Sequence, residues 1–459
     1  MCVAGDGVRK SAGQKWLFAG INSPWVGALA PDRIPSCLPG SAVLKRIAVT
    51  DLCQGMFIHE FCGSWMEHPF WKTKFLLNSA KDLQRIIDSG IEEVWIDPSK
   101  GLDVADGSKA LSPAEVAAQV EQMLVREVVE AAPKPLSASL EDEVKRAQKL
   151  CARSKDAVVA MFGEVRMGHA IDAERVTELV EEISESVIRN PDAMISLARL
   201  KTSDEYTYMH SVAVCALMIA LARQLELSDE LVRDAGVAGL LHDIGKMMIP
   251  DAILNKPGKL TDAEFNTMRD HPMAGLKLLK DNRNINAIVL DVCLHHHEKI
   301  DGSGYPHRLA GDQISLFAKM GAVCDVYDAI TSNRPYKKGW EPAESIRKMA
   351  EWSKGHFDQA IFQAFVKSVG IYPTGSLVRL ESGRLGVVMD QHATSLLTPR
   401  VKVFFMAKSK TPIPQQIIDL SKLVGREKII GRESPEDWNF PHLEELWSGL
   451  PSKNGTYFG

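Results

Sequence analysis

His242-Asp243-Ile244-Gly245-Lys246 is the stretch that decides the fold of this 459-residue chain. Histidines gather around it, since seven of the 13 in the chain fall between positions 210 and 307, including the triple His295-His296-His297. Packing gives a soluble fold no reason to cluster imidazoles, whereas a metal centre does. The segment 210–337 therefore predicts a metal site.

The order of the side chains from His242 to Lys246 suits a pair of metal ions. Neighbouring side chains on a helix diverge by about 100°, so His242 can bind one ion while the Asp243 carboxylate bridges both. Lys246 follows one turn later on the same helical face, where its charge would meet an anion held by the metals. A bare His-Asp pair is common by chance, but His-Asp-x-Gly-Lys with His210 upstream is not.

The other histidines are ambiguous when each is taken alone. His210 lies in an apolar helical segment, where a core histidine is the simpler explanation, and His271 stands near a predicted helix start. The presence of the other imidazoles favours a ligand role for both. Three consecutive side chains on a helix cannot all face one centre, so two of His295–His297 should coordinate and one should turn away.

Two carboxylates follow in the apolar helical segment 314–330. Asp325 would be costly there unless it were paired or bound to a metal. Asp328 lies one turn further on. It either supports the ligand shell or Arg334, or has a plain structural role.

Together these motifs resemble the HD-GYP family, the HD-domain phosphohydrolases that hydrolyse the bacterial second messenger cyclic di-GMP. The resemblance covers roughly residues 190–370. The HD pair stands in Leu241–Lys246, the GYP segment in His296-His297-Glu298 and Asp301–Pro306, and Asp325 with Arg334-Pro335-Tyr336 closes the pattern. The resemblance implies an all-helical, metal-dependent phosphohydrolase domain.

The resemblance also implies roles for the matching residues. The metal ligands would be His210, His242, Asp243, His271, His296, His297 and Asp325, which leaves His295 out. Asp243 and Lys246 would be catalytic, and the substrate would be bound by Lys246, Tyr305, Arg334 and Lys337, with Tyr305 stacking on guanine. The implied reaction is metal-assisted hydrolysis. A solvated basic turn is the structural alternative for Arg334 and Lys337, and turn geometry alone explains Gly302 and Gly304.

One position departs from part of this family. Members that hold a third metal carry Glu four residues before the first ligand histidine, where this chain has Tyr206 with Glu205 beside it. We therefore expect two divalent ions. Iron or manganese suits a mixed set of imidazoles and carboxylates.

The pattern along the chain predicts a mainly α protein with two smaller flanking parts. Residues 1–43 read as a disordered extension, or as a start-site artefact with the natural protein beginning near Val43. Residues 44–106 read as a small α+β accessory domain of the kind often found ahead of this family. A linker and helices (107–189), the catalytic domain (190–370) and a short β-rich appendage with a tail (371–459) follow.

Local periodicity gives the expected elements. The expected strands are Lys45–Val49, Met56–Phe61, Phe75–Leu77, Glu93–Ile96, Leu377–Leu380, Leu385–Met389 and Val401–Phe405. The expected helices outside the catalytic domain are Ser79–Ser89, Ser112–Glu130, Leu140–Phe162 and Asp172–Ile188. The last of these, the fourth, has a single apolar face made of Val176, Leu179, Val180, Ile183 and Val187. The isolated His59 and His68 are expected to be structural, and Trp65, Trp71 and Trp95 are expected in the core of the small domain.

The composition of the chain indicates which classes of partner and which location to expect. The formal net charge of -5 argues against broad DNA or RNA binding, and no apolar run reaches the roughly 18 residues needed to span a membrane. Eight scattered cysteines without a CxxC pair indicate reduced thiols in a cytoplasmic protein. Expected partners are cyclic di-GMP, diguanylate cyclase (GGDEF) domains and a second copy of the chain, although the long helices before position 190 could equally pack on their own domain.

Three functions remain open at this point. The first is an active cyclic di-GMP phosphodiesterase that yields pGpG, GMP or both. The second is a non-catalytic sensor of the same dinucleotide, which the intact ligands and Lys246 disfavour. The third is an HD phosphohydrolase of another nucleotide, which the complete GYP segment disfavours.

Overall fold

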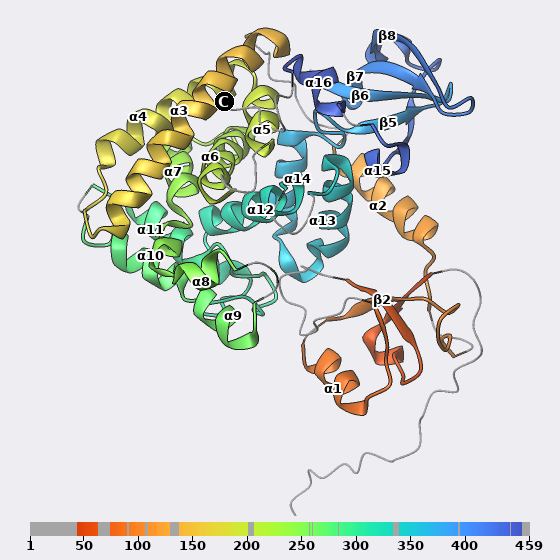
Figure 1. Cartoon of the computed structure of the whole chain (residues 1–459), viewed down its shortest axis with the longest axis horizontal. Helices are drawn as coiled ribbons and strands as arrows, with labels where there is room; N and C mark the ends of the chain where they lie inside the picture. The colour runs from red at the N-terminus through yellow and green to blue at the C-terminus, as the bar shows by residue number, and fades with distance from the viewer. Residues whose placement is uncertain are drawn as a thin grey trace, which may run out of the picture.

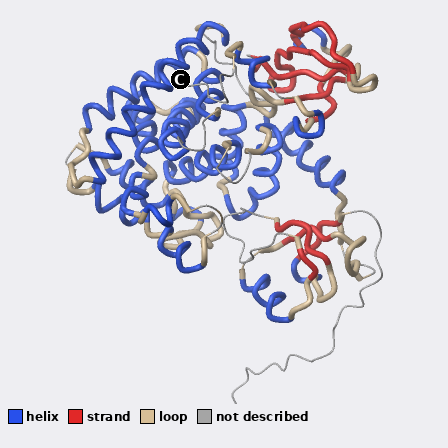
Figure 2. Tube along the Cα trace, in the orientation of Figure 1, coloured by secondary structure: helices blue, strands red, loops and turns tan. Residues whose placement is uncertain are grey.

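The computed structural model describes residues 44–62, 74–89, 91–105, 109–128, 137–200, 206–256, 258, 260–282, 284–333, 339–392, 395–440 and 442–451. The predicted extension 1–43 and the predicted linker 131–135 lie outside these ranges. Figure 1 shows a small N-terminal α+β module, a large helical body and a C-terminal sheet, and Figure 2 shows how strands are confined to the two flanking parts. This arrangement confirms the predicted fold class.

The N-terminal module is an antiparallel sheet with one helix. Its strands are β1 (Lys45–Ala48), β2 (Phe57–Phe61), β3 (Phe75–Leu76) and β4 (Glu93–Ile96), in the order β1-β4-β2-β3. Helix α1 (Ala80–Asp88) begins after Ser79, whose hydroxyl accepts a hydrogen bond from the Asp82 amide, a common N-cap. The elements agree with the predicted ones to within one residue at each end.

A separate small core holds the module together. Ile58 and Ile96 from the sheet and Ile86 from α1 are fully buried in it. Trp95, predicted for this core, is buried instead in the larger core of the chain together with Val116 of α2. This correction follows from strand alternation, because successive side chains of β4 face opposite sides of the sheet. Trp65, Trp71 and His68 lie outside the described residues.

The helical body begins with α2 (Pro113–Val128), which Figure 1 shows running between the module and the rest of the chain. The helices that follow are α3 (Leu140–Arg166), α4 (Ala173–Arg189), α5 (Pro191–Arg199), α6 (Tyr206–Gln224), α7 (Asp229–Leu241), α8 (Asp251–Leu254), α9 (Asp262–Met268), α10 (His271–Leu279), α11 (Ala287–His295), α12 (Leu316–Thr331), α13 (Pro342–His356) and α14 (Gln359–Val369). Short 3-10 turns η3 (Ile244–Met248) and η4 (Gly311–Gln313) lie among them.

Helix α6 is the centre of this body. Every side chain from Met209 to Ala222 is buried, as expected of a helix that is apolar on all sides and surrounded by others. Helices α3, α5, α7, α12 and α14 pack against it. Among the described helices, none is both long enough and apolar enough to cross a membrane.

The apolar face predicted on the fourth helix is covered by this chain itself. Val176, Val180, Ile183 and Val187 of α4 are buried, and α4 packs on α5, α6 and α7. Of the two alternatives left open by the sequence, packing on the same domain is therefore the observed one. The homodimer stays a prediction, and this face of α4 is not available for it.

The C-terminal sheet is larger than the sequence predicted. Its strands β5 (Leu377–Leu380), β6 (Arg384–His392), β7 (Ser395–Met406), β8 (Thr411–Asp419) and β9 (Ile429–Arg432) pair antiparallel in the order β8-β7-β6-β5-β9. Strands β8 and β9 were not predicted. Pro412 and Pro414 argue against a central strand, but β8 is an edge strand, where a residue without an amide proton is tolerated. The turn η5 (Leu420–Leu423) and helices α15 (Pro435–Trp438) and α16 (Leu443–Ser448) are the remaining elements of the described residues.

Candidate metal centre

His210 projects from the second turn of α6 toward two carboxylates. Its Nε2 atom lies 3.0 Å from Asp325 Oδ1 and 3.4 Å from Asp243 Oδ2. Its Nδ1 atom lies 2.6 Å from Asp328 Oδ2 on the opposite side of the ring. Because the carboxylate can only accept, Asp328 holds the His210 proton on Nδ1 and leaves the Nε2 lone pair facing the centre.

His242 and Asp243 lie at the end of a helix and not within one. Helix α7 stops at Leu241, His242 is its C-cap, and the chain continues into the 3-10 turn η3. The prediction that the motif lies on one α-helical face is therefore wrong. Asp243 and Lys246 still meet, because residues three apart eclipse in a 3-10 turn.

The Asp243 carboxylate stands between two groups of imidazoles. Its Oδ2 atom lies 3.3 Å from His242 Nε2 and faces His210, while its Oδ1 atom lies 3.2 Å from His271 Nε2 and 3.7 Å from His296 Nε2. The side chain is 1% exposed. Its two oxygens are thus directed to different sets of nitrogens, as a bridging carboxylate requires.

Gly245 explains how His271 reaches the centre. A Cβ atom at Gly245 would lie 1.9 Å from the His271 carbonyl oxygen and 2.4 Å from the Gly275 amide nitrogen. Only glycine therefore lets η3 and the first turn of α10 approach this closely. The sequence marks Gly245 as a motif residue. The reason why this position must be glycine is the close approach of α10, which the sequence does not reveal.

The triple histidine divides at the end of α11. His295 ends the helix and His296 is its C-cap, so the chain direction changes between the second and third imidazoles. His296 faces the centre, and His297 Nδ1 lies 3.8 Å from Asp325 Oδ2. His295 turns away and hydrogen-bonds Asp291 through Nδ1, at 2.7 Å.

The seven predicted ligands fall into two groups. Within each group, the ligand atoms all lie within 4.8 Å of one another. One group is His210, His242 and Asp325, and the other is Asp243, His271, His296 and His297. Glu205 and the Tyr206 side chain, on which the expectation of two metals and not three rests, lie outside what the structure describes.

The chemistry of these side chains fits divalent cations. The Nδ1 atoms of His242, His271 and His296 lie 2.8–3.1 Å from backbone carbonyl oxygens, which fixes each proton there and turns Nε2 inward. His242 Nε2 and Asp243 Oδ1 are buried without a hydrogen-bond partner, and a buried polar atom left so is costly unless something binds it.

The protonation states of the side chains in the centre favour cation binding at pH 7. Burial lowers the pKa of His296 to about 3 and holds the pKa of His297 well below its ordinary value, so both imidazoles are neutral ligands at pH 7. Burial alone would raise the pKa of Asp243, but Lys246 and His242 hold it well below the usual range. The carboxylate is therefore ionised although it is fully buried.

The GYP loop is held against the centre by Glu298. This buried carboxylate accepts hydrogen bonds from the His307 amide at 2.7 Å and the Leu309 amide at 3.0 Å. Gly302 has a φ of +78°, so turn geometry explains it, but Gly304 does not need a positive φ. A Cβ at Gly304 would lie 2.5 Å from Glu298 Cα, and close backbone approach is the reason for that glycine.

Tyr305 lies beside one of the ligands. Its ring stacks on His297, with ring centroids 4.6 Å apart, and the Arg269 guanidinium lies 4.5 Å from the Tyr305 centroid. Arg269 was not predicted. Its position two residues before His271 was the only available signal. Lys246, 21% exposed, is beside Asp243, while Arg334 and Lys337 lie outside the described residues.

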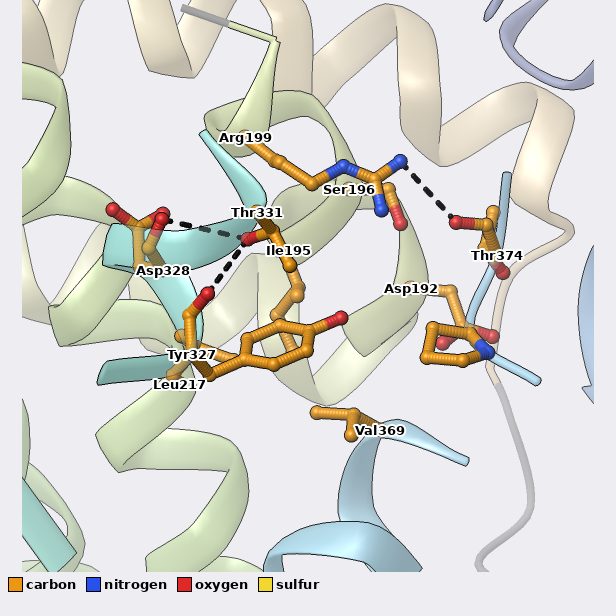
Figure 3. Close-up of a pocket in the computed structure, with 11 residues that line it drawn as sticks. Asp192, Ile195, Ser196, Arg199, Leu217, Tyr327, Asp328, Thr331, Val369 and Thr374 are labelled. Carbon is orange, nitrogen blue, oxygen red and sulfur yellow. Dashed lines mark hydrogen bonds between the residues drawn. The ribbon is translucent and has the colours of Figure 1, made fainter. Parts of the chain in front are cut away.

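Figure 3 shows a small pocket that Asp328, the partner of His210, lines together with Asp192, Arg199, Tyr327, Thr331 and Thr374 among others. It has a volume of about 10 Å³, room for roughly one water molecule. Arg199 donates to the Thr374 carbonyl oxygen across it at 3.4 Å. This hydrogen bond connects the helical body to the C-terminal segment. The pocket itself is too small for a nucleotide.

Models of two known families match successive parts of the chain. Residues 44–176 match a domain of unknown function (DUF3391), and residues 183–361 match the HD domain. The chain is 62% identical over 417 residues to Cyclic di-GMP phosphodiesterase PA4108 of Pseudomonas aeruginosa, covering 91% of this chain and 98% of that protein.

Other relatives match shorter parts of the chain. Cyclic di-GMP phosphodiesterase response regulator RpfG of Xanthomonas campestris is 49% identical over 124 residues, which cover 26% of this chain and 32% of that protein. A 3'3'-cGAMP-specific phosphodiesterase 1 of Vibrio cholerae is 34% identical over 177 residues, which cover 38% of this chain and 41% of that protein.

Proposed function

Because this chain belongs to the HD-GYP family of cyclic di-GMP phosphodiesterases, we propose that it hydrolyses cyclic di-GMP to pGpG, GMP or both. The proposed role is in bacterial second-messenger signalling. The observation that carries the proposal is the position of Asp243, whose two carboxylate oxygens face two separate groups of ligand atoms. A phosphodiester held across two adjacent cations is the substrate that such a centre fits.

Two divalent ions, iron or manganese, would occupy the centre. His210, His242 and Asp325 would hold one, and His271, His296 and His297 would hold the other, with Asp243 between them. Bound ions would polarise the phosphoryl oxygens and supply a nucleophile at neutral pH. Neutral imidazoles and ionised carboxylates at pH 7 support this assignment.

Lys246 and Arg269 are proposed to bind the substrate's phosphates. The Lys246 ammonium lies against the buried Asp243 carboxylate, yet its side chain is 21% exposed, so it borders both the centre and solvent. It would stabilise negative charge that develops on the phosphoryl oxygens. Arg269 brings a second cation to the same side as Tyr305.

Tyr305 is proposed to stack on a guanine base. The stacking of its ring on His297, a proposed metal ligand, supports a position for the base beside the centre. Base contacts by Arg334 and Lys337 remain predictions.

Turnover of cyclic di-GMP by manganese-loaded protein tests the proposal. The measurement separates products by chromatography and uses Asp243→Ala as the inactive control, with 3'3'-cGAMP as a competing substrate. Formation of pGpG or GMP by the intact protein alone supports the enzyme. Binding of cyclic di-GMP without turnover would establish the sensor instead, and faster turnover of 3'3'-cGAMP would establish the third function.

Three further proposals concern where and with what the protein acts. A cytoplasmic location is proposed on the reduced thiols Cys62, Cys215, Cys293 and Cys324. Cys53, which was predicted to be reduced as well, is disulfide-bonded in the structure, so that part of the cysteine prediction is wrong. Contact with GGDEF domains rests on the family resemblance alone. A homodimer is tested by sedimentation, and the covered face of α4 means that another surface would have to form it.

A further inference from the structure

His295, the member of the triple that turns away from the centre, forms a second cluster with Asp291 and His307. His295 Nδ1 lies 2.7 Å from Asp291 Oδ1, and His295 Nε2 lies 3.0 Å from His307 Nδ1. Asp291 is itself fixed, since its second oxygen accepts a hydrogen bond from the Ser315 hydroxyl. Neither imidazole belongs to the ligand groups of the main centre.

The tautomer of His295 follows from its partners. The Asp291 carboxylate can only accept, so the His295 proton stays on Nδ1 and the Nε2 lone pair faces His307. His307 then either donates its Nδ1 proton across the gap or carries its proton on the other ring nitrogen. In the second tautomer two lone pairs face each other, an arrangement that a cation stabilises.

The spacing of the two nitrogens fits one metal ion. With ordinary metal–imidazole distances of about 2.0–2.1 Å, nitrogens 3.0 Å apart subtend an angle of about 94° at an ion between them. This nitrogen–metal–nitrogen angle is close to a right angle and somewhat smaller than the tetrahedral angle. The arrangement of Asp291 behind His295 is the carboxylate–histidine–metal relay that raises ligand basicity.

We propose that His295 and His307 form a second, peripheral binding site for a borderline transition-metal ion such as Zn²⁺ or Cu²⁺. Imidazole suits these ions, whereas Mg²⁺ and Ca²⁺ prefer oxygen ligands. Water completes the coordination. The His295 side chain is 15% exposed and His307 is exposed, so an ion can enter from solvent. On binding, the proton between the nitrogens moves to the other nitrogen of His307.

Such an ion would cross-link two segments that border the main centre. His295 ends α11 directly before the ligand His296, and His307 follows Tyr305-Pro306 of the GYP loop. The bound ion would add a second tie beside the one that Glu298 already makes to the His307 amide. Zinc should therefore raise the melting temperature of the protein through this site.

Zinc binding by three manganese-loaded proteins tests the site: the wild type, His307→Ala and His442→Ala. His442 is a matched control, since it is a 65% exposed imidazole that also lies 3.1 Å from a carboxylate, that of Glu445, but has no neighbouring imidazole among the described residues. After equilibrium dialysis against Zn²⁺, the metal content of each protein is measured by mass spectrometry. Exchange at the main centre affects all three proteins equally.

The wild type and His442→Ala should each bind one more Zn²⁺ per chain than His307→Ala, and His307→Ala should also lose the zinc-induced rise in melting temperature. Equal zinc content in all three proteins would overturn the proposal. Crystals of the wild type soaked in Zn²⁺ give an independent readout, in which an anomalous peak between the two nitrogens is expected and its absence would contradict the site.

Discussion

Gly245→Ala should disable the metal centre without touching any ligand side chain. The new Cβ would lie 1.9 Å from the His271 carbonyl oxygen, whereas ordinary contacts begin near 3.4 Å. The first turn of α10 must therefore retreat by the difference, about 1.5 Å, because the obstructing atoms are backbone. His271 moves with that turn.

The expected losses follow from this displacement. A misplacement of about 1 Å in a catalytic group can cost roughly 100-fold in rate, and overpacking costs about 1–3 kcal/mol of stability. We expect Gly245→Ala to lose bound manganese and at least tenfold in the initial rate of cyclic di-GMP hydrolysis. Metal content and rate are measured on the same samples, with far-UV circular dichroism to show that the variant is folded.

Gly163→Ala is the matched control for this substitution. Gly163 lies exposed in α3 with no atom within 4 Å of the added Cβ, so it should keep full activity and gain about 0.5–1 kcal/mol of stability. If Gly245→Ala kept wild-type metal content and rate, the proposed link between Gly245 and His271 would be refuted.

Three other predictions use separate parts of the site. Asp328→Ala should weaken metal binding about 10–100-fold in a chelator competition, because His210 loses the acceptor 2.6 Å from its Nδ1; unchanged affinity would remove Asp328 from the site. Lys246→Ala should keep its manganese but lose about 100- to 1,000-fold in kcat, and a kcat near wild type would argue against charge stabilisation by Lys246. Burial raises the pKa of Asp192 to about 7, so the folded wild type should lose stability relative to Asp192→Asn as pH rises from about 4 to 7, by up to about 4 kcal/mol. Urea denaturation of both proteins at pH 4 and pH 8 measures this difference, and equal stabilities at both values would contradict it.

The sequence predicted the helices well where burial is one-sided. The face of Val176, Val180, Ile183 and Val187 gave the fourth helix to within one residue. The same periodicity could not say which surface covers that face. In the structure it packs on neighbouring helices of the same chain.

The seven candidate ligands were predicted from the histidine-rich motifs and the family resemblance that these motifs carry, and the structure brings them together in two groups. Asp243 and Asp325 are buried carboxylates, and both lie against imidazoles. The local backbone could not be predicted, since the change from α7 to a 3-10 turn after Leu241 depends on α10 packing against Gly245.

Residues that act through tertiary contacts were the hardest to predict. Arg269 reaches Tyr305 across 36 positions of sequence, and the only local signal for it is its position two residues before His271. Strand β8 was missed for a different reason. Its prolines are unfavourable for a strand in general and are tolerated only because β8 forms the edge of its sheet.

The central claim, a two-metal centre bridged by Asp243, is tested most directly by reconstitution. Metal-free protein is titrated with manganese under anaerobic conditions, and bound metal and cyclic di-GMP hydrolysis are measured at each step. Hydrolysis should appear as the second ion per chain is bound, and it should be absent throughout in His242→Ala/Asp243→Ala. Full activity at one ion per chain, or no hydrolysis with two bound, would contradict the account.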